Sequence, residues 1–208
     1  MVEALAPPNV AASIIPLVVR FRPLYAMTPD EFFELSLLNP DLKIELTSEG
    51  EIVFMSPSGT ETGALNAQII LALGRWASED KSGVFFDSSA GFTLPNKAVR
   101  APDASWVRRE KWTALSPRQR QRFAPLCPDF VIEVDSPSDR LKDLQAKMDE
   151  YIANGAQLGW LILPETRQVM VYRPGQDMQL HSDVDAIAAD PELPGFTLDL
   201  TLIWQPLG

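Results

Sequence analysis

The chain has 208 residues, of which 46% are hydrophobic and 22% are charged, and its formal net charge at pH 7 is −10. This length is enough for one well-packed core, and the sequence has no run of 18 or more apolar residues that would span a bilayer. The acidic balance argues against a protein that coats nucleic acid through bulk electrostatics.

Cysteine and histidine are almost absent, which excludes several kinds of chemistry. Cys127 and His181 are the only two such residues, too few within one chain for a structural zinc site or a histidine-based catalytic triad. Carboxylates, lysine and arginine remain, and they suit hard cations such as Mg²⁺ or Mn²⁺. A lone cysteine makes no intramolecular disulfide and the N-terminal segment lacks a signal-peptide pattern, so we expect a cytoplasmic protein.

The beginning of the chain differs in composition from the rest. Residues 1–26 are rich in proline and are interpreted as an N-terminal extension, and we expect residues 27–208 to form a single domain. Thr28 is followed by a proline and two acids, which is a favourable helix start, and this helix should end near residues 39–40.

Next along the chain come a hairpin, a helix and several short strands. LKIEL and EIVFM, separated by TSEG, predict a β-hairpin. Apolar side chains recur at helical spacing between residues 60 and 77. GVFFD, AGFTL and DASWV are expected strands.

The second half of the chain predicts a strand–helix–strand unit. DFVIEVD, RLKDLQAKMDEYIANG and LGWLIL have the lengths of a parallel crossover, and QVMVYRP should pair with LGWLIL across a short turn. The tail ends in ELPGFTLDLTLIW. Together the elements predict a mixed sheet flanked by helices, in the α/β or α+β class.

Acidic residues interrupt two of these strands. Side chains two apart on a strand share a face, so Glu133 and Asp135 should point the same way from an otherwise apolar strand. Asp103 opens the upstream strand in a similar setting. If the two strands are neighbours, three carboxylates converge on one point.

Lys147 on the following helix is the expected partner of these acids. At about 100° per residue, it lies roughly 40° from Tyr151 and 60° from Leu144, both in the apolar stripe of the helix. Lys142 lies about 140° further round. A charged site is thus one interpretation. The other is that the acids cap turns or open strands, while Lys147 only extends past the apolar face.

The motifs APDASWV, PDFVIEVDSPSDRLKDLQAKMDEYIANGAQLGWLILP, VYRPG, MSPSGTETGALNAQI and ELPGF, in their chain order, resemble the Uma-type restriction endonuclease family. The resemblance runs from about Met27 to Trp204. That family is placed in the PD-(D/E)xK nuclease superfamily, whose core is a mixed sheet flanked by helices. The resemblance implies a metal-dependent endonuclease acting on DNA, with Mg²⁺ or Mn²⁺ as cofactor.

The resemblance also implies which residues form the site. Asp103 matches the PD element and Glu133 the D/E position, but Asp135 stands where the superfamily usually has lysine. The resemblance implies a migrated lysine, which matches Lys147. Catalytic roles therefore fall to Asp103, Glu133 and Lys147, and metal binding to Asp103, Glu133 and Asp135.

Two further acids are minor candidates, because they resemble acidic positions near the site in this superfamily. Glu45 lies in the hairpin and Glu61 opens the following helix. Each also has an ordinary explanation, as a surface strand acid and as an acid at a helix N-terminus.

One segment is basic against the acidic whole. Residues 108–122 hold six of the 18 basic residues and one acid. Because the segment directly follows the strand of Asp103, we expect it to flank the site and contact DNA phosphates, although an ordinary solvated helix and loop is an equal alternative. The arginines concerned are Arg108, Arg109, Arg118, Arg120 and Arg122.

Three functions remain open on the sequence alone. The first is a metal-dependent endonuclease that hydrolyses phosphodiester bonds in DNA. The second is a catalytically degenerate protein that keeps the fold and serves as a dimeric binding or structural module. The third is a phosphoesterase with a substrate other than DNA. We expect DNA as the partner, no membrane association, and a homodimer.

Overall fold

The computed structural model describes residues 17–55 and 59–205. Residues 1–16, most of the expected N-terminal extension, lie outside the described part, as do 56–58 and 206–208 of the expected domain. Within the described ranges, no helix is long and apolar enough to cross a membrane.

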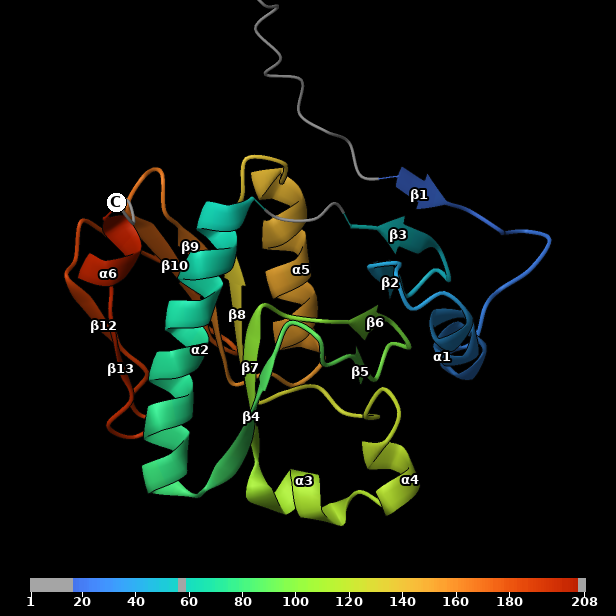
Figure 1. Cartoon of the computed structure of the whole chain (residues 1–208), viewed down its shortest axis with the longest axis horizontal. Coiled ribbons are helices and arrows are strands. Elements are labelled where there is room, and N and C mark those ends of the chain that lie inside the picture. Colours follow the sequence, from blue (N-terminus) through green and yellow to red (C-terminus); the bar gives the residue numbers. More distant parts are fainter. Residues whose placement is uncertain (1–16, 56–58, 206–208) are drawn as a thin grey trace, which may run out of the picture.

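A six-stranded mixed sheet forms the centre of the molecule (Figure 1). Its strand order is β11-β10-β9-β8-β7-β4, and only β8 and β9 run parallel. The strands are β4 (Gly83–Asp87), β7 (Ala104–Arg108), β8 (Phe130–Val134), β9 (Leu158–Leu163), β10 (Gln168–Tyr172) and β11 (Gln179–Ser182). The predicted mixed sheet and the predicted β8–helix–β9 crossover are confirmed.

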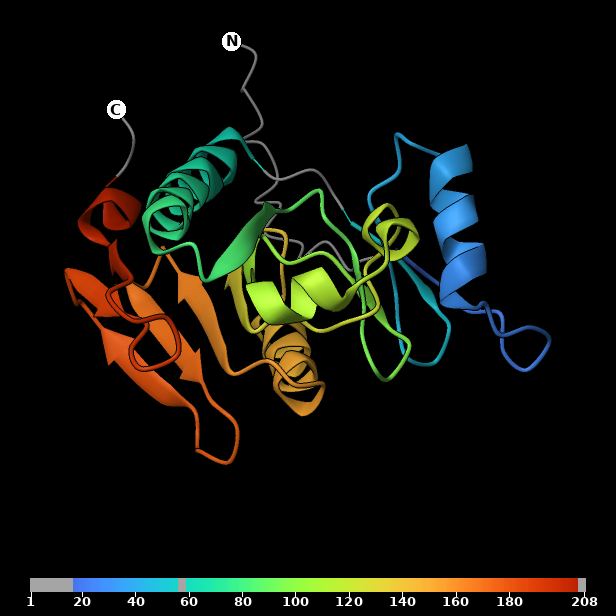
Figure 2. The same ribbon diagram turned by 90° about the horizontal axis from the view of Figure 1, so that it is seen from below.

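Helices cover both faces of this sheet (Figure 2). On one face lie α2 (Thr60–Asp80) and α6 (Thr201–Trp204), and on the other lies α5 (Leu141–Ala153). Alternation along β8 explains the two layers, because Ile132 packs with the α2 side while Val131 packs with the α5 side. A strand flanked by helices on both faces is buried on both faces, as the pattern of β8 shows.

A second, five-stranded antiparallel sheet lies beside the first, an element that the sequence did not predict as separate. Its order is β1-β3-β2-β6-β5, and α1 (Pro29–Leu38) packs on it through the buried Phe32. The strands are β1 (Leu17–Val19), β2 (Ile44–Leu46), β3 (Ile52–Phe54), β5 (Phe92–Thr93) and β6 (Val99–Arg100). The predicted hairpin is the β2–β3 pair.

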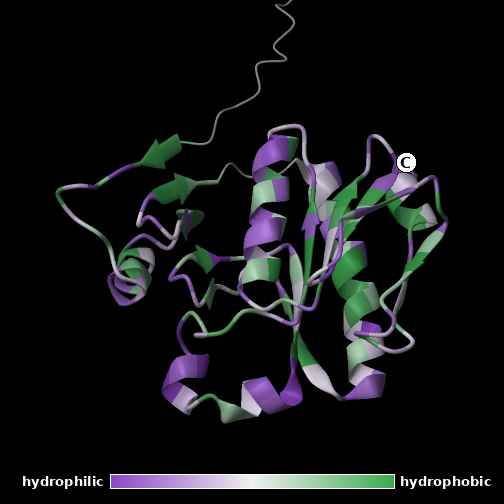
Figure 3. Cartoon of the chain, turned by 180° about the vertical axis from the view of Figure 1, so that it is seen from behind, coloured by the Kyte–Doolittle hydropathy of each residue, from purple (hydrophilic) through white to green (hydrophobic). Residues whose placement is uncertain are grey.

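The remaining elements are short. Two helices, α3 (Arg109–Ala114) and α4 (Pro117–Arg120), occupy the basic segment, and β12 (Ala186–Ala188) pairs with β13 (Thr197–Asp199). Figure 3 shows the hydrophobic colour along strands of both sheets, whereas α4 is mostly hydrophilic. The predicted start of α1 is confirmed, since Thr28 and Glu31 form a capping box there.

Candidate active site

The candidate site begins where β7 and β8 lie side by side. The two strands are antiparallel, with Ala104 opposite Ile132, so Asp103 at the start of β7 lies next to the C-terminal end of β8. Asp103 Oδ2 accepts a hydrogen bond from the Val134 amide at 2.9 Å. Its Oδ1 accepts one from Asn66 Nδ2 of α2 at 3.0 Å. These bonds fix the Asp103 carboxylate against the strand that carries Glu133.

Lys147 of α5 lies between two buried carboxylates. Its Nζ is 2.9 Å from Glu133 Oε1 and 2.9 Å from Glu45 Oε1, and its side chain is only 11% exposed. A buried ammonium is tolerated when well-placed carboxylates compensate its charge. The helix angle correctly indicated that Lys147 points to the sheet, and the structure adds Glu45 as a second, equal partner.

A second cation, Arg100, connects this group to the outer side of α5. Its Nη1 lies 3.0 Å from Glu45 Oε2, and its Nε lies 2.6 Å from Glu150 Oε2. Glu45 Oε1 also accepts a bond from the Ala101 amide at 3.0 Å. Charges of alternating sign therefore run from Glu150 through Arg100, Glu45 and Lys147 to Glu133.

Tyr151, one helical turn after Lys147, also binds Glu133. Its hydroxyl donates a hydrogen bond to Glu133 Oε1 at 2.9 Å, and its side chain is fully buried. Within the described residues, no hydrogen bond or ion pair reaches Glu133 Oε2. One oxygen of Glu133 is thus held by two donors, and the other remains available.

Burial and like charges set the protonation behaviour of the acids. Burial raises the pKa of Glu133 to about 7, Lys147 opposes the rise, and neighbouring Asp103 and Glu45 add to it. Burial also raises the pKa of Asp103. For Glu45, burial alone would raise the pKa, but Lys147 and Arg100 together lower it below the usual value. Glu133 therefore keeps a raised pKa in spite of its contact with Lys147, chiefly because it is buried.

These side chains open into a cavity of about 640 Å³. Asp103, Glu133, Glu45 and Lys147 all line it, together with the turn between β8 and α5. The lining contains seven carboxylates and four cationic side chains, so the cavity is negatively charged overall. Because its net charge is negative, the cavity attracts cations more strongly than phosphate, even though it contains the buried ammonium of Lys147.

The donor set fits a hard divalent cation. Asp103 and Glu133 supply carboxylate oxygens at adjacent strand positions, and Glu133 Oε2 has no competing partner among the described residues. A cation there would also compensate the charge of Glu133, whose pKa is raised by burial and, to a smaller extent, by repulsion from neighbouring acids. Within residues 17–55 and 59–205, no group of three or more acids, histidines or cysteines is placed to hold a metal.

Two predicted acids are not brought into this cavity. Asp135 lies beyond β8, which ends at Val134, and it does not line the cavity. Burial raises its pKa to about 6, with Asp139 and Glu165 as its acidic neighbours. The expected three-carboxylate cluster therefore does not form, because strand alternation stops where the turn begins. Glu61 lies exposed in the first turn of α2, also away from the cavity.

The basic segment does not flank the cavity either, contrary to the expectation. Five residues of β7 separate Asp103 from α3, which places Arg108 about 17 Å away at the opposite end of the strand. Arg108 pairs with Asp129 at 3.6 Å, and Arg109 Nε donates to the Lys81 carbonyl at 2.6 Å. None of the five predicted arginines lines the cavity.

The remaining predicted arginines have protein partners or lie on the surface. Arg120 lies over the ring of Trp112 at 5.4 Å. Arg122 pairs with Glu34 at 2.9 Å and Asp30 at 3.4 Å, and Arg118 is exposed on α4. Their expected contact with nucleic acid stays a prediction.

Sequence reasoning missed Arg100, Glu150, Tyr151 and Asn66 as parts of the site. Tyr151 was assigned to the apolar stripe of α5, and its buried hydroxyl is the signal that it needed a polar partner. Glu150 lies next to it on the helix, but nothing in the spacing indicates Arg100, which is 50 residues away.

The comparisons with known proteins agree with this fold and with the motif resemblance. A family model, Uma2, described as "Putative restriction endonuclease", matches residues 29–201. The crystal structure of a "putative nuclease belonging to DUF820" from Anabaena variabilis ATCC 29413 is similar, with a TM-score of 0.70 and 22% sequence identity. The similarity covers 86% of this chain and 97% of that chain. Comparison with curated proteins gave no match.

Proposed function

Because the chain belongs to the Uma2 family of restriction-endonuclease-like proteins, we propose that it is a metal-dependent endonuclease that hydrolyses phosphodiester bonds in DNA. The family supports a nuclease role, and the similar fold of the DUF820 protein agrees with it. Metal dependence and DNA as substrate are proposed here from the chemistry of the cavity. The proposed cofactor is Mg²⁺ or Mn²⁺.

The observation that carries the proposal is the position of Lys147. Its ammonium is fixed between Glu133 and Glu45, in the same cavity as Asp103. An ammonium has three N–H donors, and the two glutamates occupy two of them. The third donor can serve a phosphate oxygen or the attacking water. A buried, paired lysine that lines a cavity together with acids supports a catalytic role for this group.

Each residue has a defined role in the proposed reaction. Asp103 and Glu133 would hold the metal ion, which when bound polarises the phosphate and lowers the pKa of a coordinated water. Lys147 would donate a hydrogen bond to the negative charge that develops on the phosphate. Tyr151 is a positioning residue, because its hydroxyl holds Glu133 Oε1 and leaves Oε2 directed to other partners.

A catalytically degenerate protein is the second candidate, and one observation favours it. Both oxygens of Asp103 already accept hydrogen bonds, and Asp135 adds no third carboxylate. Such a protein would keep the ion pairs of Lys147 as structural contacts. Metal binding separates the two candidates, because the degenerate protein has no use for a cation between Asp103 and Glu133.

The test is cleavage of supercoiled and linear duplex DNA at millimolar Mg²⁺ or Mn²⁺, with EDTA as the blank. We expect Glu133→Gln and Lys147→Met to lose cleavage by at least 100-fold, the usual scale for a group that stabilises the transition state. Glu61→Gln is the matched control, since it removes an acid outside the cavity. Cleavage that survives in both site variants, or is absent from the wild type, contradicts the proposal. Hydrolysis of a non-nucleic phosphodiester alone would indicate a different phosphoesterase.

A further inference from the structure

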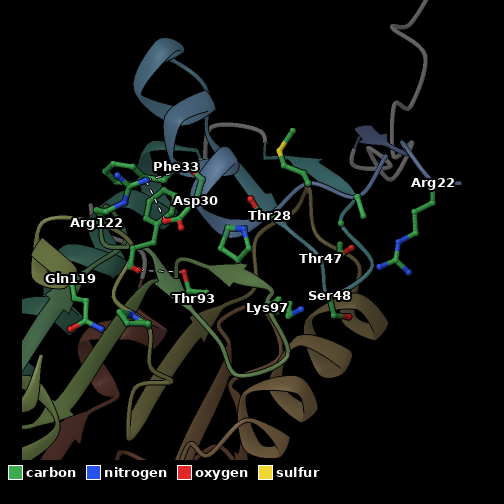
Figure 4. Close-up of a pocket in the computed structure, with 16 residues that line it drawn as sticks. Arg22, Thr28, Asp30, Phe33, Thr47, Ser48, Thr93, Lys97, Gln119 and Arg122 are labelled. Atoms are coloured by element: carbon green, nitrogen blue, oxygen red, sulfur yellow. Dashed lines mark hydrogen bonds and ion pairs between the residues drawn. The ribbon is translucent and has the colours of Figure 1, made fainter. Parts of the chain in front are cut away.

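A second cavity lies beside the first, on the other side of the β2–β3 turn (Figure 4). It has a volume of about 690 Å³, and it lies between α1, the β2–β3 turn, the β5–β6 turn and the segment after α4. Thr47 and Ser48 line both cavities. A ligand that leaves the candidate active site over these two residues therefore enters the second cavity directly.

The two cavities have opposite charge. The second is lined by three cations, Arg22, Lys97 and Arg122, and by one acid, Asp30. The candidate active site has an excess of carboxylates over cations. A polyanion such as DNA is repelled by the first cavity alone, so its binding needs positive charge outside that cavity. The second cavity supplies such charge directly beside the first, across Thr47 and Ser48.

Two of the three cations have no ion-pair partner within the part of the chain that the structure describes. Arg122 is held by Asp30 and Glu34, with its guanidinium 4.2 Å from the ring centre of Phe33. Arg22 and Lys97 are exposed, and neither makes an ion pair with any described residue. In the view of Figure 4 the Ser48 hydroxyl lies between the ends of these two side chains.

We propose that the second cavity is a subsite for the phosphate backbone of DNA, in which Arg22 and Lys97 bind phosphates next to the scissile one and Thr47 and Ser48 form the bridge from the active site. This inference rests on the proposed nuclease function. It replaces the basic segment 108–122 as the main phosphate contact. Arg122 of that segment lines the second cavity, but Asp30 and Glu34 already pair with it.

The backbone at Lys97 allows a clean test. Its φ is +74°, in the left-handed region that asparagine tolerates well. Lys97→Asn thus removes the charge without straining the β5–β6 turn, and Arg22→Gln removes the other charge at an exposed position. Arg75→Gln is the matched control, because Arg75 is exposed on α2 and lines neither cavity.

The measurement is the affinity for a 20-base-pair duplex as a function of salt, with Ca²⁺ in place of Mg²⁺. For the double variant Arg22→Gln/Lys97→Asn we expect binding weaker by roughly tenfold or more at 0.1 M salt, and a salt slope shallower by about 1.8. Under cleavage conditions its KM should rise while kcat stays near the wild-type value. Each single variant should show about half the change in slope, and circular dichroism verifies folding.

The outcomes separate this inference from the proposed function. If the wild type binds and cleaves DNA and the double variant behaves like Arg75→Gln, the subsite is wrong and the nuclease function stands. If the wild type binds no DNA even at low salt, the proposed function is wrong and the subsite falls with it. A double variant with lower kcat and unchanged KM would also contradict a phosphate-binding role.

Discussion

At the scale of single residues, Glu133 combines two properties that usually exclude each other. It lies in a fully buried strand, and it faces a cavity together with Asp103 and Glu45. Burial and these neighbours outweigh Lys147, so the pKa of Glu133 rises to about 7. A buried carboxylate with a raised pKa gains stability when a metal ion binds it. Without a cation, its negative charge destabilises the fold.

The raised pKa of Glu133 predicts that stability falls with increasing pH, and that Glu133→Gln removes this dependence. The folded pKa of about 7 lies above the usual 4.5, so ionisation of Glu133 destabilises the fold as pH rises from about 4.5 to about 7. In EDTA, the free energy of unfolding of the wild type minus that of Glu133→Gln should fall by on the order of 2 to 3 kcal/mol across this range. Urea unfolding at several pH values measures it. A difference that stays constant or increases would show that Glu133 is not held in this way.

Among the charged residues of the site, Lys147 is the one whose loss should cost the most stability, because it pairs with two buried carboxylates. Lys147→Met leaves Glu133 and Glu45 buried without their shared ammonium, which typically costs about 3–5 kcal/mol. The loss should be smaller at pH 5, because Glu133 is then protonated. Lys142→Met on the exposed side of α5 is the control, with an expected change within about 0.5 kcal/mol. Equal effects of the two substitutions in denaturant unfolding would contradict the burial of the pair.

At the scale of elements, the site joins three parts of the molecule that pack separately. The main sheet contributes Glu133, α5 contributes Lys147, and the second sheet contributes Glu45 and Arg100. Arg100 links β2 to Glu150 of α5 through two ion pairs. The orientation of the β2–β3 hairpin against α5 therefore depends on buried charge as well as on apolar packing.

We expect Arg100→Gln to loosen the second sheet and leave the main sheet intact. The substitution leaves Glu45 with Lys147 alone and Glu150 without a cation, at a cost of about 1–3 kcal/mol. Native-state hydrogen exchange should then show faster exchange in β2 and β3, and unchanged protection in β8 and β9. Arg20→Gln is the control, because its pair with Glu51 is exposed and contributes at most about 1 kcal/mol. Uniform loss of protection in both sheets would contradict this view.

The sequence predicted most elements, because each has a local signal. The capping residue Thr28, the helical spacing in α2 and α5, and the alternation in β8 are all local, and all were confirmed. The inward direction of Lys147 follows from helix geometry alone. Asp135 was misplaced because the same alternation was extended past Val134, where the strand ends.

Contacts between distant segments account for the parts that the sequence did not predict. Glu45 lies about a hundred residues before Lys147, and only the family resemblance named it, as a minor candidate; its contact with Lys147 was not predicted, because nothing in its own surroundings distinguishes it from a surface strand acid. The basic segment follows Asp103 closely in the chain, but β7 carries it to the other end of the sheet. Proximity in sequence was therefore a poor guide to proximity in space.

At the scale of the whole molecule, charge is distributed unevenly around two adjoining cavities. A net charge of −10 would disfavour DNA binding if it were uniform, but the second cavity carries an excess of cations beside the acidic one. The proposed metal ion would reduce the negative charge of the first cavity. Metal binding and DNA binding should therefore favour each other. The expected homodimer and cytoplasmic location stay predictions from the sequence.

Metal binding should stabilise the whole fold. At 100 times its dissociation constant, a cation that binds only the folded protein stabilises it by about 2.7 kcal/mol, which raises the melting midpoint by about 5–10 °C for a domain of this size. The gain in thermal unfolding with Mg²⁺ or Mn²⁺ should vanish in Glu133→Gln and persist in Glu61→Gln. A wild type that melts at the same temperature with and without metal would favour the degenerate protein.

The central claim is that Asp103 and Glu133 bind one divalent cation beside Lys147. Anomalous diffraction from crystals soaked in Mn²⁺ tests it most directly. We predict an anomalous peak bonded to carboxylate oxygens of Asp103 and Glu133, including Glu133 Oε2, with Lys147 still paired to Glu45. No peak in the cavity at millimolar Mn²⁺, or a peak only at surface acids, would contradict the claim.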